Sequence, residues 1–214
     1  EERGLMVRMG IWVPQEAYRQ LRRWEEEFSS SRDLVISVNL SARQCTHPDL
    51  LQQVRRILHD TGVQPSRLKL EITEGVILEN TDIVESVLRE LRTLGVQLGL
   101  DDFGMGYSAL SYLHHFPFQT IKIDRTFVSG MEEGSNTEII RAIVSLAAGL
   151  AMNVTAEGIE TADQVNKLQE LACEFGQGFY FDKPLTREHA QAILREGPRL
   201  ERRATPHGGA FAPR

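Results

Sequence analysis

Short apolar runs alternate with amphipathic stretches along most of this chain. The apolar runs predict strands over Leu34–Asn39, Leu68–Thr73, Val96–Leu100, Thr120–Ile123, Asn153–Ala156 and Gly178–Phe181. Stretches with helical periodicity separate most of them, from about Val13 onward and over 48–59, 82–94, 137–150, 162–173 and 187–194. This alternation is typical of βαβ units and predicts an α/β fold with a parallel sheet.

Polar residues at the strand ends favour one kind of parallel sheet. Nearly every run ends in a carboxylate, a carboxamide or a lone lysine. Barrel enzymes gather such residues at the carboxyl ends of their strands, whereas an open doubly wound sheet concentrates them near one switch point. We therefore expect a TIM-like (β/α) barrel, incomplete because the chain provides about six of the eight strands. The open sheet remains the alternative.

Composition narrows the class of protein and its setting. With 214 residues, 41% of them hydrophobic, we expect one domain over residues 1–197. Residues 198–214 lack periodicity and predict a disordered tail. The net charge of −6 argues against DNA or RNA as a partner. Two cysteines and the absence of a long apolar stretch indicate a reduced, cytoplasmic setting without membrane contact by this segment.

Asp101 and Asp102 directly follow an apolar run, and Lys122 and Asp124 lie two apart on another. A pair of carboxylates can serve two divalent cations, and a lysine among acids can orient an attacking water. Both patterns have plainer explanations. Asp101-Asp102 is also consistent with a helix cap or an Asx-turn, and Lys122–Asp124 with a buried ion pair.

Glu71 and Asn39 are further oxygen donors near strand ends. Glu71 lies within an apolar strand, where an unpaired carboxylate is costly, so it needs a cation or a lysine beside it. Asn39 offers a hard carbonyl oxygen suited to Mg²⁺ or Mn²⁺, or simply starts a loop. Glu74, at the exit of the Glu71 strand, is explained well enough by the dipole of a following helix.

Glu157 follows another strand, with Glu160 three residues later, and Gln177 lies between two glycines. The glycines would allow close approach of a ligand to Gln177. So many acids on one face repel one another unless a cation lies among them, so the pattern as a whole predicts a metal site.

The motifs VNLSARQ, LEITE, LGLDDFGMGYSAL, IKIDRTFV, TAEGIE and QGFYFDKPL also resemble, in order and spacing, those of the EAL-domain cyclic di-GMP phosphodiesterases of bacteria. The resemblance runs from about Glu1 to Leu194. It implies a hydrolase that uses two Mg²⁺ or Mn²⁺ ions to direct water in line at one phosphodiester of cyclic di-GMP, with linear 5′-pGpG as product.

The resemblance also implies residue roles. Asn39, Glu71 and Asp101 would hold the first cation, and Asp101 would bridge to a second held with Asp102 and Glu157. Lys122 would help to position the water, with Asp124 supporting it. Gln177 would lie near water or substrate.

A mobile loop is implied as well, in which Phe103, Gly104, Gly106, Tyr107 and Ser108 take part. Glu74 and Glu160 would anchor this region, with Glu74 coupling it to a dimer interface. A homodimer and an upstream sensory or GGDEF domain are the expected partners.

One departure from the family pattern matters. The Glu-Ala-Leu tripeptide that names the family does not occur in these 214 residues. We expect the intact protein to be an active phosphodiesterase but these residues alone to be unstable or dimeric, and weak or inactive. The alternative is an inactive EAL-like domain that binds cyclic di-GMP as a receptor or regulatory module.

Overall fold

The computed structural model describes residues 2–31, 33–79, 81–105, 113–131, 135–196 and 212–213. The chain divides into two compact units, each treated by itself below. Unit 1 comprises Glu1–Leu100 and Ser108–Phe118, and unit 2 comprises Asp101–Tyr107 and Gln119–Arg214. Strand β3 (Gln97–Phe103) crosses the boundary, so the chain passes from unit 1 to unit 2 between Leu100 and Asp101.

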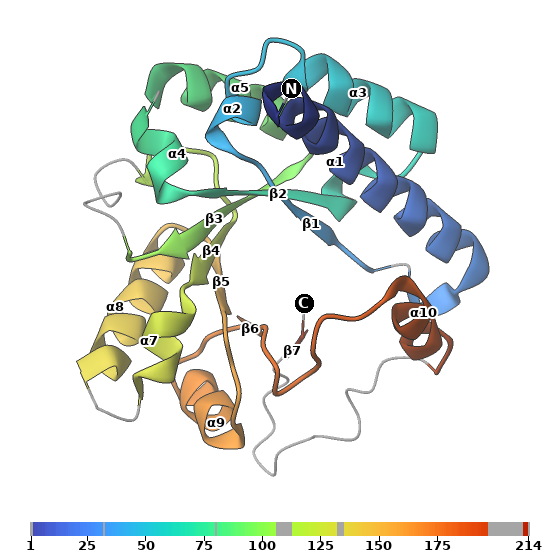
Figure 1. Cartoon of the computed structure of the whole chain (residues 1–214). Coiled ribbons are helices and arrows are strands. Elements are labelled where there is room, and N and C mark those ends of the chain that lie inside the picture. Colours follow the sequence, from blue (N-terminus) through green and yellow to red (C-terminus); the bar gives the residue numbers. More distant parts are fainter. Residues whose placement is uncertain are drawn as a thin grey trace. The chain divides into compact units, whose positions relative to one another are not determined.

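Unit 1 contains parallel strands covered by helices (Figure 1). Strand β1 (Ile36–Asn39) pairs with β2 (Leu68–Thr73) in parallel, and Asn39 lies opposite Glu71. The helix α1 packs on α3 and β1. The helices of this unit are α1 (Glu2–Glu27), α2 (Ala42–Cys45), α3 (Leu50–Thr61), α4 (Glu74–Glu79) and α5 (Thr81–Thr93), with 3₁₀ turns at Ser29–Ser31 and Pro65–Arg67.

Unit 2 continues the parallel pattern. Strand β4 (Thr120–Ile123) pairs with β5 (Asn153–Ala156), β5 with β6 (Phe175–Gly176), and β6 with the two-residue β7 (Ala212–Pro213). Helix α8 packs on β4 and β5. The helices of this unit are α7 (Arg125–Ser129), α8 (Ser135–Gly149), α9 (Ala162–Glu170) and α10 (Arg187–Glu196).

The sequence located five of its six strands correctly and misplaced the last. The strand predicted over Gly178–Phe181 is wrong, because β6 ends at Gly176 and the chain then turns, with the N–H of Phe181 donating to Gly178 O at 3.1 Å. The aromatic residues that suggested a strand lie in this turn.

Helix boundaries differ as well. Helix α1 begins at Glu2 rather than near Val13, and Pro14 lies within it. Strand β3 extends to Phe103, so Asp101 and Asp102 belong to the strand and not to the loop after it. Among the residues that the structure describes, no helix combines the length and apolar character needed to cross a membrane.

Candidate metal centre

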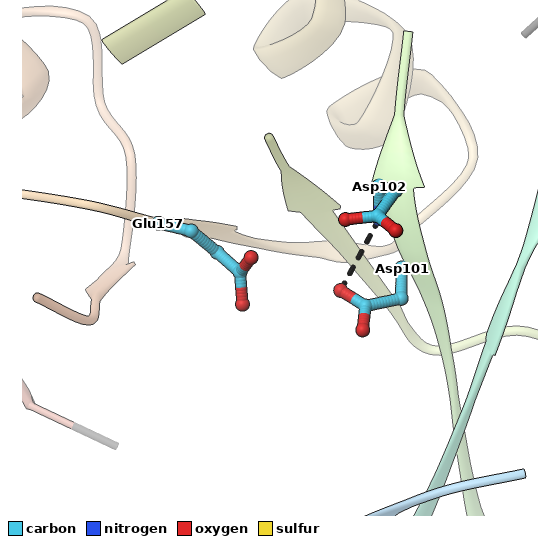
Figure 2. A group of neighbouring side chains, drawn as sticks. All are labelled: Asp101, Asp102 and Glu157. Atoms are coloured by element: carbon cyan, nitrogen blue, oxygen red, sulfur yellow. Dashed lines mark hydrogen bonds between the residues drawn. The ribbon is translucent and has the colours of Figure 1, made fainter. Parts of the chain in front are cut away.

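Asp101 and Asp102 lie at the end of β3, and strand alternation alone would point them to opposite faces. The backbone of Asp102 instead adopts φ +54°, a left-handed conformation that Asp tolerates better than most residues. The N–H of Asp102 donates to Asp101 Oδ1 at 3.2 Å. With this backbone conformation, the carboxylates of Asp101 and Asp102 lie close to each other (Figure 2).

Glu157 completes an acidic cluster with these two residues. It follows β5 directly, and its N–H donates to Ile123 O at 3.1 Å, which continues the pairing of β5 with β4. One carboxylate oxygen from each of Asp101, Asp102 and Glu157 lies within 4.8 Å of the others. Figure 2 shows the Glu157 side chain extending from its own segment toward the two aspartates.

Lys122 on β4 joins two of these acids. Its Nζ lies 3.0 Å from Asp101 Oδ1 and 2.5 Å from Glu157 Oε1. The lysine side chain is 8% exposed. Lys122 therefore takes part in a buried ion-pair network, and the acids that it contacts, Asp101 and Glu157, come from the ends of two different strands.

The electrostatics of the cluster favour a cation. Partial desolvation raises the pKa of Asp102, the negative charges of Asp101 and Asp124 raise it further, and Lys122 opposes them. Three carboxylates against one ammonium leave excess negative charge. The donors are all hard oxygens at the spacing that divalent cations bridge, so the residues present fit Mg²⁺ or Mn²⁺.

Unit 1 brings together a second set of predicted ligands. Asn39 and Glu71 face each other across the β1–β2 pair, and Leu40 N–H donates to Glu71 O at 2.8 Å. The Asn39 residue is exposed, whereas Glu71 and Glu74 are buried. Glu74 begins α4, as its predicted position at a helix start requires.

Asp124 caps a helix in unit 2. Its Oδ1 accepts from Thr126 N at 2.9 Å and from Thr126 Oγ1 at 2.5 Å, at the start of α7. Burial alone would raise the pKa of Asp124, but these hydrogen bonds and the nearby Arg125 lower it overall. Support of Lys122 by Asp124 stays a prediction.

Gln177 and Glu160 contribute through their backbones to the loop after β5. Gln177 N–H donates to Ala156 O at 2.8 Å and its carbonyl accepts from Ile159 N–H at 3.1 Å. Glu160 N–H donates to Gln164 Oε1 at 2.8 Å. These contacts fix the segment that carries Glu157.

Of the five residues predicted to take part in the loop, the structure describes Phe103 and Gly104. Phe103 is buried, and Gly104 has φ +98°. Gly106, Tyr107 and Ser108 lie outside the described residues, so their predicted role is not addressed by the structure.

Sequence reasoning missed two kinds of residue. Lys69 is 1% exposed in β2, and its side chain lies with that of Glu71 over Gly99. Its alternation with Glu71 in LKLEITE was the available signal. Gly158 and Gln164 also make contacts next to the site. These contacts arise only from tertiary packing, so the positions of the two residues in the sequence do not indicate them.

Fold and site together define an α/β protein with parallel strands and a candidate divalent-cation centre at the strand ends. The EAL domain family model matches residues 1–184. The chain belongs to the EAL-domain family, and the predicted fold class is confirmed.

Named relatives agree with this assignment. The chain is 39% identical over 195 residues to the bifunctional diguanylate cyclase/cyclic di-GMP phosphodiesterase MucR of Pseudomonas aeruginosa, covering 91% of this chain and 28% of MucR. It is 36% identical over 186 residues to the cyclic di-GMP phosphodiesterase PdeR of Escherichia coli, covering 86% of this chain and 28% of PdeR. The chain thus spans less than a third of either relative.

Solved structures match over most of the chain. The MucR phosphodiesterase in complex with c-di-GMP aligns with a TM-score of 0.83 and 39% identity, covering 89% of this chain and 76% of that one. Klebsiella pneumoniae BlrP1 in a manganese and cyclic di-GMP complex aligns with a TM-score of 0.75 and 28% identity, covering 84% and 45%.

Proposed function

We propose that the protein hydrolyses cyclic di-GMP to linear 5′-pGpG with two divalent cations, Mg²⁺ or Mn²⁺. The observation that carries this proposal is the cluster of Asp101, Asp102 and Glu157 with Lys122 among them. Two relatives named as cyclic di-GMP phosphodiesterases support the substrate, and a structurally similar protein solved with manganese and cyclic di-GMP supports the cation.

Asn39, Glu71 and Asp101 would hold one cation, and Asp102 and Glu157 the other, with Asp101 bridging. Bound cations would supply Lewis-acid activation of water and stabilise charge on the phosphoryl oxygens.

The remaining site residues would act on water and substrate. Lys122, already within 3.0 Å of Asp101 and 2.5 Å of Glu157, would donate a hydrogen bond that orients the attacking water or offsets charge on a phosphoryl oxygen. Gln177 would lie beside water or substrate, and Asp124 would hold the segment that follows Lys122. Glu74 and Glu160 would anchor the loop that begins at Phe103.

Partners and setting follow from the family. We infer a homodimer, an upstream sensory or GGDEF domain and a cytoplasmic location. MucR, whose name joins a diguanylate cyclase to a phosphodiesterase, supports an upstream cyclase domain.

A receptor function is the second candidate, because the Glu-Ala-Leu tripeptide is absent from the 214 residues. In that case the acidic cluster would bind cyclic di-GMP without hydrolysing it and signal to an attached domain.

Chromatography of the reaction products distinguishes the phosphodiesterase function from the receptor function. Full-length protein with Mn²⁺ should convert cyclic di-GMP to pGpG, and Asp101→Ala or a chelator should abolish the conversion. Residues 1–214 alone should convert it slowly or not at all. Binding of cyclic di-GMP by the full-length protein without any product would favour the receptor.

A further inference from the structure

Two glycines next to the candidate ligands press against the same short helix. Gly104, two residues after Asp102, has φ +98°, and a Cβ there would lie 2.7 Å from Phe127 Cε2. Gly158, directly after Glu157, has φ +69°, and a Cβ there would lie 2.4 Å from Arg125 Cβ. Real Cβ contacts are not this short, so both positions need glycine. The segments carrying Asp102 and Glu157 therefore meet the first turn of α7.

Polar contacts reinforce this meeting on the Asp102 side. Thr126 Oγ1 lies 3.3 Å from Met105 Sδ and 2.5 Å from Asp124 Oδ1. The hydroxyl has one proton, which the carboxylate accepts more strongly than a thioether does. The hydroxyl is thus fixed by the helix cap, and Met105 packs on it.

Gln164 ties the Glu157 side to the same helix. Its Oε1 accepts from Glu160 N–H at 2.8 Å and from Thr161 N–H at 3.1 Å, and its Nε2 donates to Val128 O at 3.4 Å. The residue is 7% exposed, so little water competes for these bonds. The loop after β5 therefore contacts α7 through Gly158 and again through Gln164.

Helix α7 is itself fixed to the site, because it begins at Arg125, three residues after Lys122 on β4. Cation coordination tolerates displacements of only about 0.5 Å from the productive geometry. The segments that carry Asp102 and Glu157 both pack against α7. The position of this helix can therefore set the separation between the two carboxylates.

We propose that the first turn of α7, Arg125–Phe127, together with Gln164, is a positioning platform that sets the spacing of the Asp102 and Glu157 carboxylates for cation binding. This inference rests on the proposed function, since it assumes that these carboxylates bind cations. The platform residues touch neither cation nor substrate and act through the backbone of the ligand segments.

Calorimetric titration of the chelator-treated full-length protein with Mn²⁺ tests the platform, with every variant measured well below its Tm. Gly158→Ala would displace the Glu157 segment from Arg125, and the Kd for Mn²⁺ should rise about tenfold or more, as for loss of an outer-shell partner. Gly149→Ala is the matched control, because a Cβ at Gly149 at the end of α8 meets nothing within 4 Å. Its Kd should equal that of the wild type.

A comparison of single and double variants tests the contact between Gly104 and the ring of Phe127. Gly104→Ala should weaken Mn²⁺ binding, and adding Phe127→Leu should restore part of the loss by making room for the new methyl group. This comparison also tests the platform if the Gly158→Ala variant does not fold. A platform that only stabilises the fold would change Tm and leave both the Kd and the electron paramagnetic resonance spectrum of bound Mn²⁺ unaltered.

The outcomes separate the two levels of inference. A wild-type protein that binds no Mn²⁺ overturns the proposed function, and the platform with it. A wild type that binds Mn²⁺ while Gly158→Ala and Gly104→Ala bind it equally well overturns the platform alone.

Discussion

Lys122 is a buried cation that contacts two acids of the candidate metal centre. Its Nζ contacts Asp101 and Glu157 at 3.0 and 2.5 Å, and its side chain is 8% exposed. An ammonium ion in this position offsets the repulsion between carboxylates and keeps the site folded. In the proposed reaction, the same ammonium would also orient the attacking water.

Replacing this lysine should destabilise the protein in the absence of metal, and added metal should offset part of the loss. In a chelator, Lys122→Met leaves two carboxylates uncompensated and should lower the free energy of unfolding by about 3 kcal/mol. Added Mn²⁺ should raise the Tm of the variant more than that of the wild type, because the cation replaces the missing positive charge. Denaturant and thermal melts in chelator and in Mn²⁺ measure both effects. Equal Mn²⁺-induced shifts in Tm would contradict this account.

Asp124 offers a pH-dependent test at the same scale. Its carboxylate caps α7 through Thr126, so Asp124→Ala should cost about 1 kcal/mol of unfolding free energy at neutral pH. Because the folded state lowers the pKa of this carboxyl, its contribution is complete above the ordinary value of about 3.9 and is lost as the pH falls through the lowered folded value. The difference between wild type and Asp124→Ala should therefore shrink in acid.

Asp124→Asn is the matched control, since asparagine caps helices as well as aspartate does. Its stability should stay near that of the wild type at neutral pH. Hydrolysis that survives in Asp124→Asn would show that the cap suffices, whereas hydrolysis lost in both variants would show that the charge of Asp124 supports Lys122.

At the scale of elements, Arg67 joins α1 to the strands of unit 1. Its side chain is 8% exposed, and Nε donates to Leu34 O at 2.8 Å. The guanidinium also contacts the Glu25 carboxylate on α1 and the carbonyl of Ser31. One side chain thus satisfies acceptors on a helix, a 3₁₀ turn and the approach to β1.

Removing this guanidinium should destabilise unit 1. Arg67→Met removes one donor from each of the Leu34 carbonyl, the Ser31 carbonyl and the partly buried Glu25 carboxylate, and should cost about 3 kcal/mol in a denaturant melt. Arg89→Met is a suitable control, because the Arg89–Glu85 ion pair is largely exposed and should contribute less than about 1 kcal/mol. Equal losses in the two variants would contradict a central role for Arg67.

Elements with strong periodicity were predictable from sequence, and those fixed by tertiary contacts were not. Strands β1 to β5 follow from apolar runs such as Thr120–Ile123, which the structure reproduces with the same ends. Strand β6 was misplaced because it has two residues, too few for a pattern, while the aromatic run after it lies in a turn. The helix α7 was overlooked because five residues are too short to show a period.

The candidate site was predictable in its residues more than in its geometry. Acids at strand ends pointed to Asp101, Asp102 and Glu157, and the structure brings these three together. The sequence could not show that the left-handed backbone of Asp102 turns its carboxylate back beside Asp101. Nor could it identify Gly158, since its contact with Arg125 arises only from packing.

At the scale of the whole molecule, the family match and the candidate ligands fall on the same stretch of the chain. The EAL domain match covers residues 1–184, and the strand-end residues that suggested a metal centre all fall within it. The chain spans 28% of MucR and 28% of PdeR.

The central claim is that the carboxylates of Asp101, Asp102 and Glu157 bind divalent cations. Crystals of the protein grown with Mn²⁺ and measured at the manganese absorption edge test it most directly. The account predicts an anomalous difference peak within coordinating distance of these three carboxylates. Crystals in which this cluster has no manganese peak, with Lys122 still bridging Asp101 and Glu157, would contradict it.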